Sequence, residues 1–146
     1  MEITLIERCN KTTEDTIATE AAAYLQTPVS TLKANQEEFI YMESPAYEEK
    51  KMDAVVFEFD EMFEVYTALF GLRLQKKYAE AIKGYFKNNL KSMLGSSSAS
   101  FAGDEGIWEI NIALSAMEGF TGEENFEQAN TILLNFVEKM LSEIVQ

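Results

Sequence analysis

The chain has 146 residues, a formal net charge of −13 at neutral pH, no histidine and a single cysteine. This length suits a single domain over residues 1–146, and an apolar fraction of 47% is too high for a disordered chain. Histidine and cysteine supply most neutral-pH acid–base groups, nucleophile–base pairs and transition-metal ligands. Their scarcity argues against an enzyme, a metal site or a bound cofactor.

The N-terminal part, residues 1–52, gives the weaker structural signals. An alternating pattern over residues 3–9 predicts a short strand. A helix is predicted next, starting at Thr12-Thr13 and ended by the first proline of the chain. Residues 38–43 fit a strand, and the charged, turn-like residues 44–51 predict a mobile loop.

A β-hairpin is predicted where the alternation sharpens. Residues 55–59 predict one strand and residues 63–67 a second, joined by a three-residue loop. This register places Glu58 opposite Glu64, a like-charge pair that costs stability unless a cation lies nearby. A helix over residues 62–70 also fits the apolar spacing, so the second element remains either a strand or a helix.

An amphipathic helix is predicted from Lys76 to Leu94, and Gly95 ends it. Its apolar face consists of Tyr78, Ile82, Tyr85, Phe86 and Met93. The turn over residues 103–106, Gly-Asp-Glu-Gly, then precedes the clearest strand of the chain, Trp108–Ala116. The even-numbered residues of this strand are predicted to be buried and Glu109 and Asn111 to be exposed, as in an antiparallel sheet with one wet face.

The final helix is predicted to start at the capping box Thr121–Glu124 and to run to about Val145. Its core stripe consists of Phe126, Leu133, Val137, Met140, Leu141 and Ile144. Ile132 and Phe136 lie beside this stripe and widen the apolar arc. They either cover the edge of the sheet or form an exposed patch of the kind that marks a protein interface.

The basic residues are concentrated in one segment. Between Arg73 and Lys91 lie six of the twelve basic residues and a single acidic residue. Lys83, Lys87 and Lys91 follow one another on the outer face of the predicted helix. They form either a docking face for an acidic partner or phosphate, or an ordinary solvated helix face.

These elements predict an α+β fold, an antiparallel β-sheet with flanking helices and the C-terminal amphipathic helix packed on the sheet. The core, residues 53–146, reads strand hairpin, helix, strand hairpin, helix. From Val55 onward this order, with its acidic turn, resembles the YbjN-like and type III secretion chaperone-like superfamily over roughly residues 55–146. The resemblance implies a protein, often dimeric, that binds other proteins and does not turn over a substrate.

Other possible sites have ordinary structural interpretations. The acidic group Glu58, Asp60, Glu61 and Glu64 lacks the spacing of a calcium loop, so we interpret it as a solvated face. The segment Gly95–Ser98 is neither a nucleophile elbow nor a phosphate loop. Cys9 is expected to be a small buried hydrophobic residue.

The function predicted from the sequence is that of a non-catalytic protein-binding module, a chaperone-like or regulatory adaptor whose partner is another protein or a second copy. Candidate partner-binding residues are Ile132, Phe136, Lys83, Lys87 and Lys91. The alternative is an acidic decoy or inhibitor protein that occupies a basic nucleic-acid-binding surface of another protein. The acidic charge disfavours direct contact with nucleic acid or membranes. Without a signal-peptide pattern or a long apolar run, the expected location is the cytoplasm.

Overall fold

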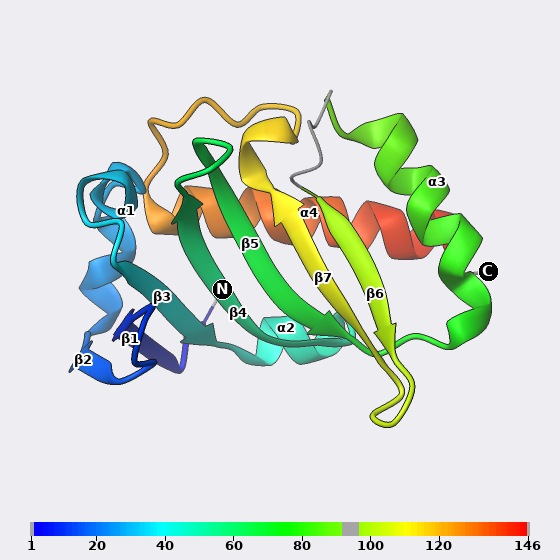
Figure 1. Ribbon diagram of the computed structural model, residues 1–146, viewed down its shortest axis with the longest axis horizontal. Helices are drawn as coiled ribbons and strands as arrows, with labels where there is room; N and C mark the ends of the chain where they lie inside the picture. The colour runs from blue at the N-terminus through cyan, green and yellow to red at the C-terminus, as the bar shows by residue number, and fades with distance from the viewer. Residues whose placement is uncertain (1, 92–96, 146) are drawn as a thin grey trace.

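The computed structural model describes residues 2–91 and 97–145. The strands of these residues form one antiparallel sheet in the order β2-β1-β3-β4-β5-β7-β6 (Figure 1). Their bounds are β1 Leu5–Asn10, β2 Thr16–Thr19, β3 Glu38–Glu43, β4 Met52–Asp60, β5 Val65–Leu72, β6 Ser98–Ala102 and β7 Ile107–Ala113. The α-helices are α1 Ser30–Ala34, α2 Pro45–Glu49, α3 Ala79–Asn89 and α4 Phe126–Ile144, with 3₁₀ turns at Ala22–Gln26, Lys76–Tyr78 and Leu114–Ala116.

The long helix α4 crosses one face of the sheet, which we call the closed face (Figure 1). Alternate residues of the central strands pack against it, since successive side chains of a strand point to opposite faces. The buried set includes Val55, Phe57, Phe59, Ala68, Phe70, Trp108, Ile110, Ile112, Phe126, Leu133, Val137 and Met140. The predicted α+β fold with the C-terminal helix on an antiparallel sheet is therefore confirmed. No described helix is both long enough and apolar enough to cross a bilayer.

The hairpin of β4 and β5 exists, but its predicted register is wrong. Asp60 pairs with Val65, so the loop has four residues, and Glu58 faces Thr67 rather than Glu64. The cause is local, because the Asp60 carboxylate accepts the backbone N–H groups of Met62 and Phe63, at 2.9 and 3.1 Å. Glu64 then closes the loop with a left-handed φ of 54°. The alternative helix over residues 62–70 is also wrong.

The helix predicted after Thr12-Thr13 is wrong. The Asn10 side chain accepts the backbone N–H groups of both threonines, which reverses the chain. The following residues therefore pair with β1 as strand β2, and only the 3₁₀ turn Ala22–Gln26 has helical character.

Two further segments near the N-terminus are regular. Residues 38–43 form strand β3, as predicted. The segment predicted as a loop contains α2, because Ser44 caps it and Tyr47 anchors it in the core. The Tyr47 hydroxyl donates a hydrogen bond of 2.8 Å to the Asn130 carboxamide oxygen of α4. This bond joins the short helix to the long one.

The basic helix is shorter than predicted. A 3₁₀ turn precedes α3, and at Leu90 the backbone is already extended. The predicted end of the helix, with Met93 and Gly95, lies outside the described residues. The strand predicted over Trp108–Ala116 ends at Ala113, where a 3₁₀ turn begins.

The start of α4 also differs from the prediction. Asn125 is the N-cap and forms a capping box with Gln128. The predicted capping residue Glu124 lies in the preceding loop instead. Its carboxylate accepts the backbone N–H groups of Thr121 and Gly122, each at 2.8 Å. Burial alone would raise the pKa of the Glu124 carboxyl, but these hydrogen bonds outweigh it and lower the pKa.

Candidate functional site

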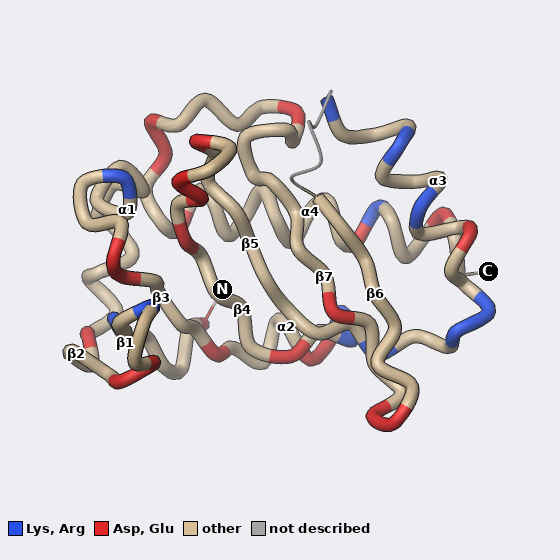
Figure 2. The backbone as a smooth tube through the Cα atoms, viewed as in Figure 1, with Lys and Arg blue, Asp and Glu red and all other residues tan. Residues whose placement is uncertain are grey.

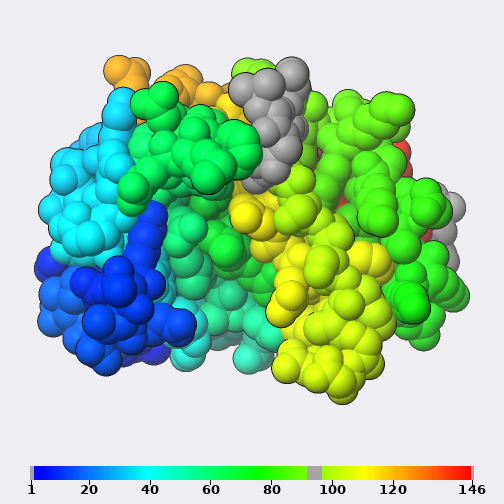
Figure 3. Space-filling model, in the orientation of Figure 1, coloured from blue at the N-terminus to red at the C-terminus, as the bar shows by residue number. Residues whose placement is uncertain are grey.

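The second face of the sheet, which we call the open face, has none of the described helices across its centre (Figure 1). A hollow of about 520 Å³ lies over β4, β5 and β7 on this side. Figure 3 shows it as a depression between the N-terminal strands and the β6–β7 hairpin. Its floor carries the half-buried side chains of Val56, Leu69 and Ile107. The open face therefore presents apolar surface where a one-sided sheet usually presents polar residues.

Gly71 shapes one end of this hollow. A Cβ atom built on Gly71 would lie 2.6 Å from Cδ1 of Ile107 and 2.8 Å from Oδ2 of Asp53. Both side chains therefore occupy the space that a Cβ atom would need, and any larger residue at this position would displace them. The apolar floor and one acidic group are brought together at this position.

Acidic residues surround the apolar floor. Asp53, Glu105 and Glu109 line the hollow, and none of its described lining residues is basic. Figure 2 shows the acidic positions on β7 and its turn, whereas the basic positions of α3 lie beyond the edge of the sheet. Asp53 is neutralised by an ion pair with Arg73. The exposed Glu109 has its side chain on the open face, so the hollow as a whole favours a cation.

Glu58 adds a half-buried carboxylate to the same face. Burial raises the pKa of the Glu58 carboxyl, the nearby ammonium of Lys11 lowers it, and Asp60 raises it further. The Lys11 ammonium donates a 2.7 Å hydrogen bond to the backbone carbonyl of Phe59. Ionised Glu58 is therefore only partly compensated by its surroundings.

Asn111 lies on the floor of the hollow, opposite Ser98 of β6. It is half-buried, where the strand pattern predicted exposure, because the neighbouring strand β6 and the concave face shield it. Its side-chain oxygen is shielded from solvent and has no hydrogen-bond partner among the described residues. An unpaired buried acceptor costs about 1–3 kcal/mol, so it is a position where a hydrogen-bond donor would be stabilising.

The apolar pair predicted from the sequence lies elsewhere, on the closed side. Ile132 and Phe136 are half-buried and line a cleft of about 230 Å³ between α3 and α4. The Phe136 ring contacts Tyr85, with ring centroids 5.4 Å apart, and Phe86, at 6.3 Å. Phe136 thus packs α3 onto α4.

The predicted lysines are not brought to this cleft. Lys83 and Lys87 are exposed on α3, Lys91 is exposed just beyond its end, and the lining of the cleft includes none of the three. A role for the apolar pair or for the lysines in partner binding remains a prediction.

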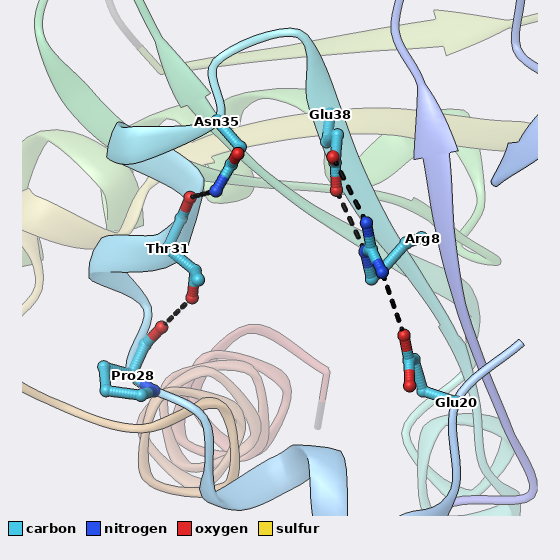
Figure 4. A network of polar contacts seen from close by, with 6 residues as sticks. All are labelled: Arg8, Glu20, Pro28, Thr31, Asn35 and Glu38. Atoms are coloured by element: carbon cyan, nitrogen blue, oxygen red, sulfur yellow. Dashed lines mark hydrogen bonds and ion pairs between the residues drawn. The ribbon is translucent and has the colours of Figure 1, made fainter. Parts of the chain in front are cut away.

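An ion-pair network joins the N-terminal strands, and no sequence pattern predicted it (Figure 4). The Arg8 guanidinium donates to Glu38 at 3.0 Å and to Glu20 at 3.2 Å, and both hydrogen bonds raise the pKa of Arg8. A cavity of about 240 Å³ beside it is also lined by Tyr24 and Asn35. Because two carboxylates already occupy the guanidinium, we interpret the network as a cross-link between β1, β3 and the segment after β2.

No group of acidic, histidine or cysteine side chains within the described residues is arranged to hold a metal ion. In the acidic group of the β4–β5 loop, Asp60 is instead engaged by the backbone of the turn. Cys9 is buried, and burial raises the pKa of its thiol.

Comparison with known proteins gives no relative for this chain. No family model, no curated protein and no solved structure matches it. The resemblance to the YbjN-like and type III secretion chaperone-like superfamily therefore remains a prediction that rests on the order of elements.

Proposed function

We propose that this protein is a non-catalytic protein-binding module whose open face binds a basic segment of a partner protein. The supporting observation is the hollow on the uncovered side of the sheet, with an apolar floor and acidic lining residues. In this proposal the protein acts as a chaperone-like or regulatory adaptor, because it holds a segment of another chain and leaves it chemically unchanged.

The apolar floor favours a protein partner over a small ion. Val56, Leu69 and Ile107 lie on neighbouring strands and are only half-buried. Contiguous exposed apolar surface is a usual mark of a protein interface, and burying it supplies about 25 cal/mol per Å². The apolar side chains of the bound segment would contact these three residues.

The acidic lining favours lysine and arginine in the bound segment. Glu105 and Glu109 are exposed, and apart from residues 73–91 the chain carries a large excess of acid. Such a field accelerates association with a cationic partner and rejects acidic ones. The unpaired oxygen of Asn111 adds an acceptor for a backbone or side-chain N–H group.

The test uses a synthetic peptide of alternating lysine and valine, compared with peptides in which serine or glutamate replaces the lysine. Amide NMR shifts are recorded during each titration. We expect the lysine–valine peptide to shift the amides of β4, β5 and β7, the glutamate peptide to leave them unchanged, and the serine peptide to bind more weakly. A Leu69→Lys variant is expected to lose binding by roughly tenfold or more. Asn88→Lys on exposed α3 is the matched control and should bind like the wild type.

A further peptide, in which serine replaces the valine and the lysine is kept, tests the acidic-decoy alternative. A surface recognised by charge alone would bind a lysine–serine peptide as tightly as the lysine–valine peptide, and would release both steeply as salt is raised. If Leu69→Lys and Asn88→Lys lost binding to the same extent, that result would also favour the acidic-decoy alternative. Shifts confined to the cleft between α3 and α4, or no shifts at all, would rule out the open face as the binding surface.

A further inference from the structure

A second cavity adjoins the hollow where β3 ends and β4 begins. Its volume is about 490 Å³, and Asp53 and Ala54 line both cavities. The strand register explains this continuity, because Tyr41 of the second cavity pairs with Val56 on the floor of the hollow. Directly paired residues of an antiparallel sheet lie on the same face. The second cavity, which we call the rim cavity, therefore continues the open face beyond the hollow.

The core and the helix α2 hold the wall of the rim cavity in place. Tyr47 and Met52 belong to its lining, and both are buried in the core. The Ser44 side chain caps α2 by accepting the Ala46 N–H at 3.1 Å, and Tyr47 is hydrogen-bonded to Asn130 of α4. A wall that is already ordered lowers the entropic cost of binding a ligand.

Three carboxylates and one guanidinium line the rim cavity. Figure 2 shows acidic positions where β4 begins, beside α2. Asp53 is neutralised by Arg73, and the Tyr41 hydroxyl donates a 2.7 Å hydrogen bond to one carboxylate oxygen of Glu43. Neither Glu43 nor Glu48 forms an ion pair with a described basic residue. A cation bound in the rim cavity would therefore have two carboxylates to neutralise.

The ring of Tyr41 favours an arginine over a lysine as this cation. The ring is half-buried and belongs to the lining, next to the Glu43 carboxylate. A guanidinium is planar, stacks on aromatic faces and donates several hydrogen bonds in one plane, whereas an ammonium is a compact charge. Arg73 already places one guanidinium against a carboxylate of the same cavity.

We propose that the rim cavity binds an arginine side chain of the basic segment that occupies the hollow, with Glu43 and Glu48 as its carboxylate partners. This inference rests on the proposed function, because the hollow places the segment beside the rim cavity. Neighbouring strands lie about 4.8 Å apart and an extended chain advances about 3.3 Å per residue, so one or two residues suffice to pass from Val56 to Tyr41. The preferred segment therefore carries an arginine one or two residues beyond its apolar part.

The test extends the lysine–valine peptide, at either end, by glycine and one further residue. That residue is arginine, lysine or citrulline, which has the shape of arginine but is uncharged. We expect the arginine peptide to bind the full chain roughly three- to tenfold more tightly than the citrulline peptide, with the lysine peptide between them. We also expect it to shift the amides of residues 41–48, which the unextended peptide should leave unchanged.

A double variant then assigns the contact to the two carboxylates. Glu43→Gln with Glu48→Gln should reduce the preference for arginine over citrulline to less than about twofold. It should leave binding of the unextended peptide nearly unchanged. Both residues are exposed, so a thermal melt of the double variant should match the wild type. Glu49→Gln is the matched control, because Glu49 is also exposed on α2 but does not line the rim cavity.

The arginine site and the hollow can fail separately in this experiment. Equal binding of the arginine peptide and either of the other two extended peptides overturns the arginine site, even if the unextended peptide binds the hollow. A preference for arginine that persists in the double variant also overturns it, since the guanidinium then lies elsewhere. If the unextended peptide does not bind but the arginine peptide shifts residues 41–48 alone, the arginine site is supported and the hollow is not. Absence of binding by every peptide overturns both.

Discussion

The two faces of the sheet are made by the same strands, yet they differ in how completely they are covered. On the closed face, Phe57 and Ile112 are 0% exposed beneath α4. On the open face, their strand neighbours Val56 and Asn111 remain half-buried beside the hollow. Because the side chains of a strand alternate between the two faces, one set stabilises the fold and the other set stays partly exposed beside the hollow. The difference can be tested one face at a time.

The largest difference in stability is expected at the closed face. Ile112→Ala should lower the free energy of unfolding by about 2–5 kcal/mol, because it leaves a cavity in a fully buried site. Leu69→Ala on the open face should cost less than about 1.5 kcal/mol, since its side chain is only half-buried. Urea unfolding of both variants measures the two values. Equal costs would mean that the open face is as well packed as the closed one and is a poor binding surface.

The closed face is also the part of the molecule that the sequence predicts best. In β7 the even-numbered residues from Trp108 to Ile112 are buried, as their alternation indicates, and Glu109 is exposed. The same holds for α4, whose predicted core stripe from Phe126 to Met140 faces the sheet. These patterns are local, so a single segment contains the whole signal.

The errors arise where one polar side chain redirects the backbone. Asn10 reverses the chain into strand β2, where the sequence pattern predicts a helix. Asp60 lengthens the β4–β5 loop from three residues to four and so changes the register of this hairpin. Each residue supplies a single short-range acceptor, which leaves no periodic pattern to detect.

The candidate site depends on contacts between distant parts of the chain. Gly71 lies under Ile107 and Asp53, which come from two other strands. The open-face residues could be identified from the sequence as the non-core positions of each strand. The hollow itself could not, because its shape follows from the pairing order of β4, β5 and β7.

A second, smaller effect is expected where the closed side continues between α3 and α4. Phe136→Ala should cost about 2–3 kcal/mol, less than the ~3–5 kcal/mol of a fully buried phenylalanine, because the ring is half-exposed. The ring contacts with Tyr85 and Phe86 would be lost, so α3 should open first. Amide hydrogen exchange measures this as faster exchange in α3 with unchanged exchange in β7. Phe136→Leu is the control, since it keeps most of the apolar volume. Unchanged exchange in α3 would mean that its buried side chains Ile82, Tyr85 and Phe86 hold this helix in place without the Phe136 ring.

The smallest expected effect is on the pH dependence of folding stability, which should have opposite signs for a carboxyl on the open face and one beside α4. Burial raises the pKa of Glu58 on the open face, whereas hydrogen bonds lower that of Glu124 before α4. A raised carboxyl pKa favours folding below the unfolded-state pKa, and this contribution is lost as pH rises through the folded-state value. A lowered pKa does the reverse, since its contribution is present above the unfolded-state pKa and is lost as pH falls through the folded-state value.

Urea unfolding across the acidic range therefore tests both carboxyls, with stability nearly flat from about pH 6 to 8 because the chain has no histidine. At neutral pH, Glu58→Gln should be more stable than the wild type and Glu124→Gln less stable, and both differences should shrink on acidification. If Glu58→Gln matches the wild type at every pH, the open face imposes no cost on its carboxylate. If the predicted gain is observed, the open face keeps a charge that folding alone disfavours, as expected of a surface whose acidic groups serve to bind a cationic partner.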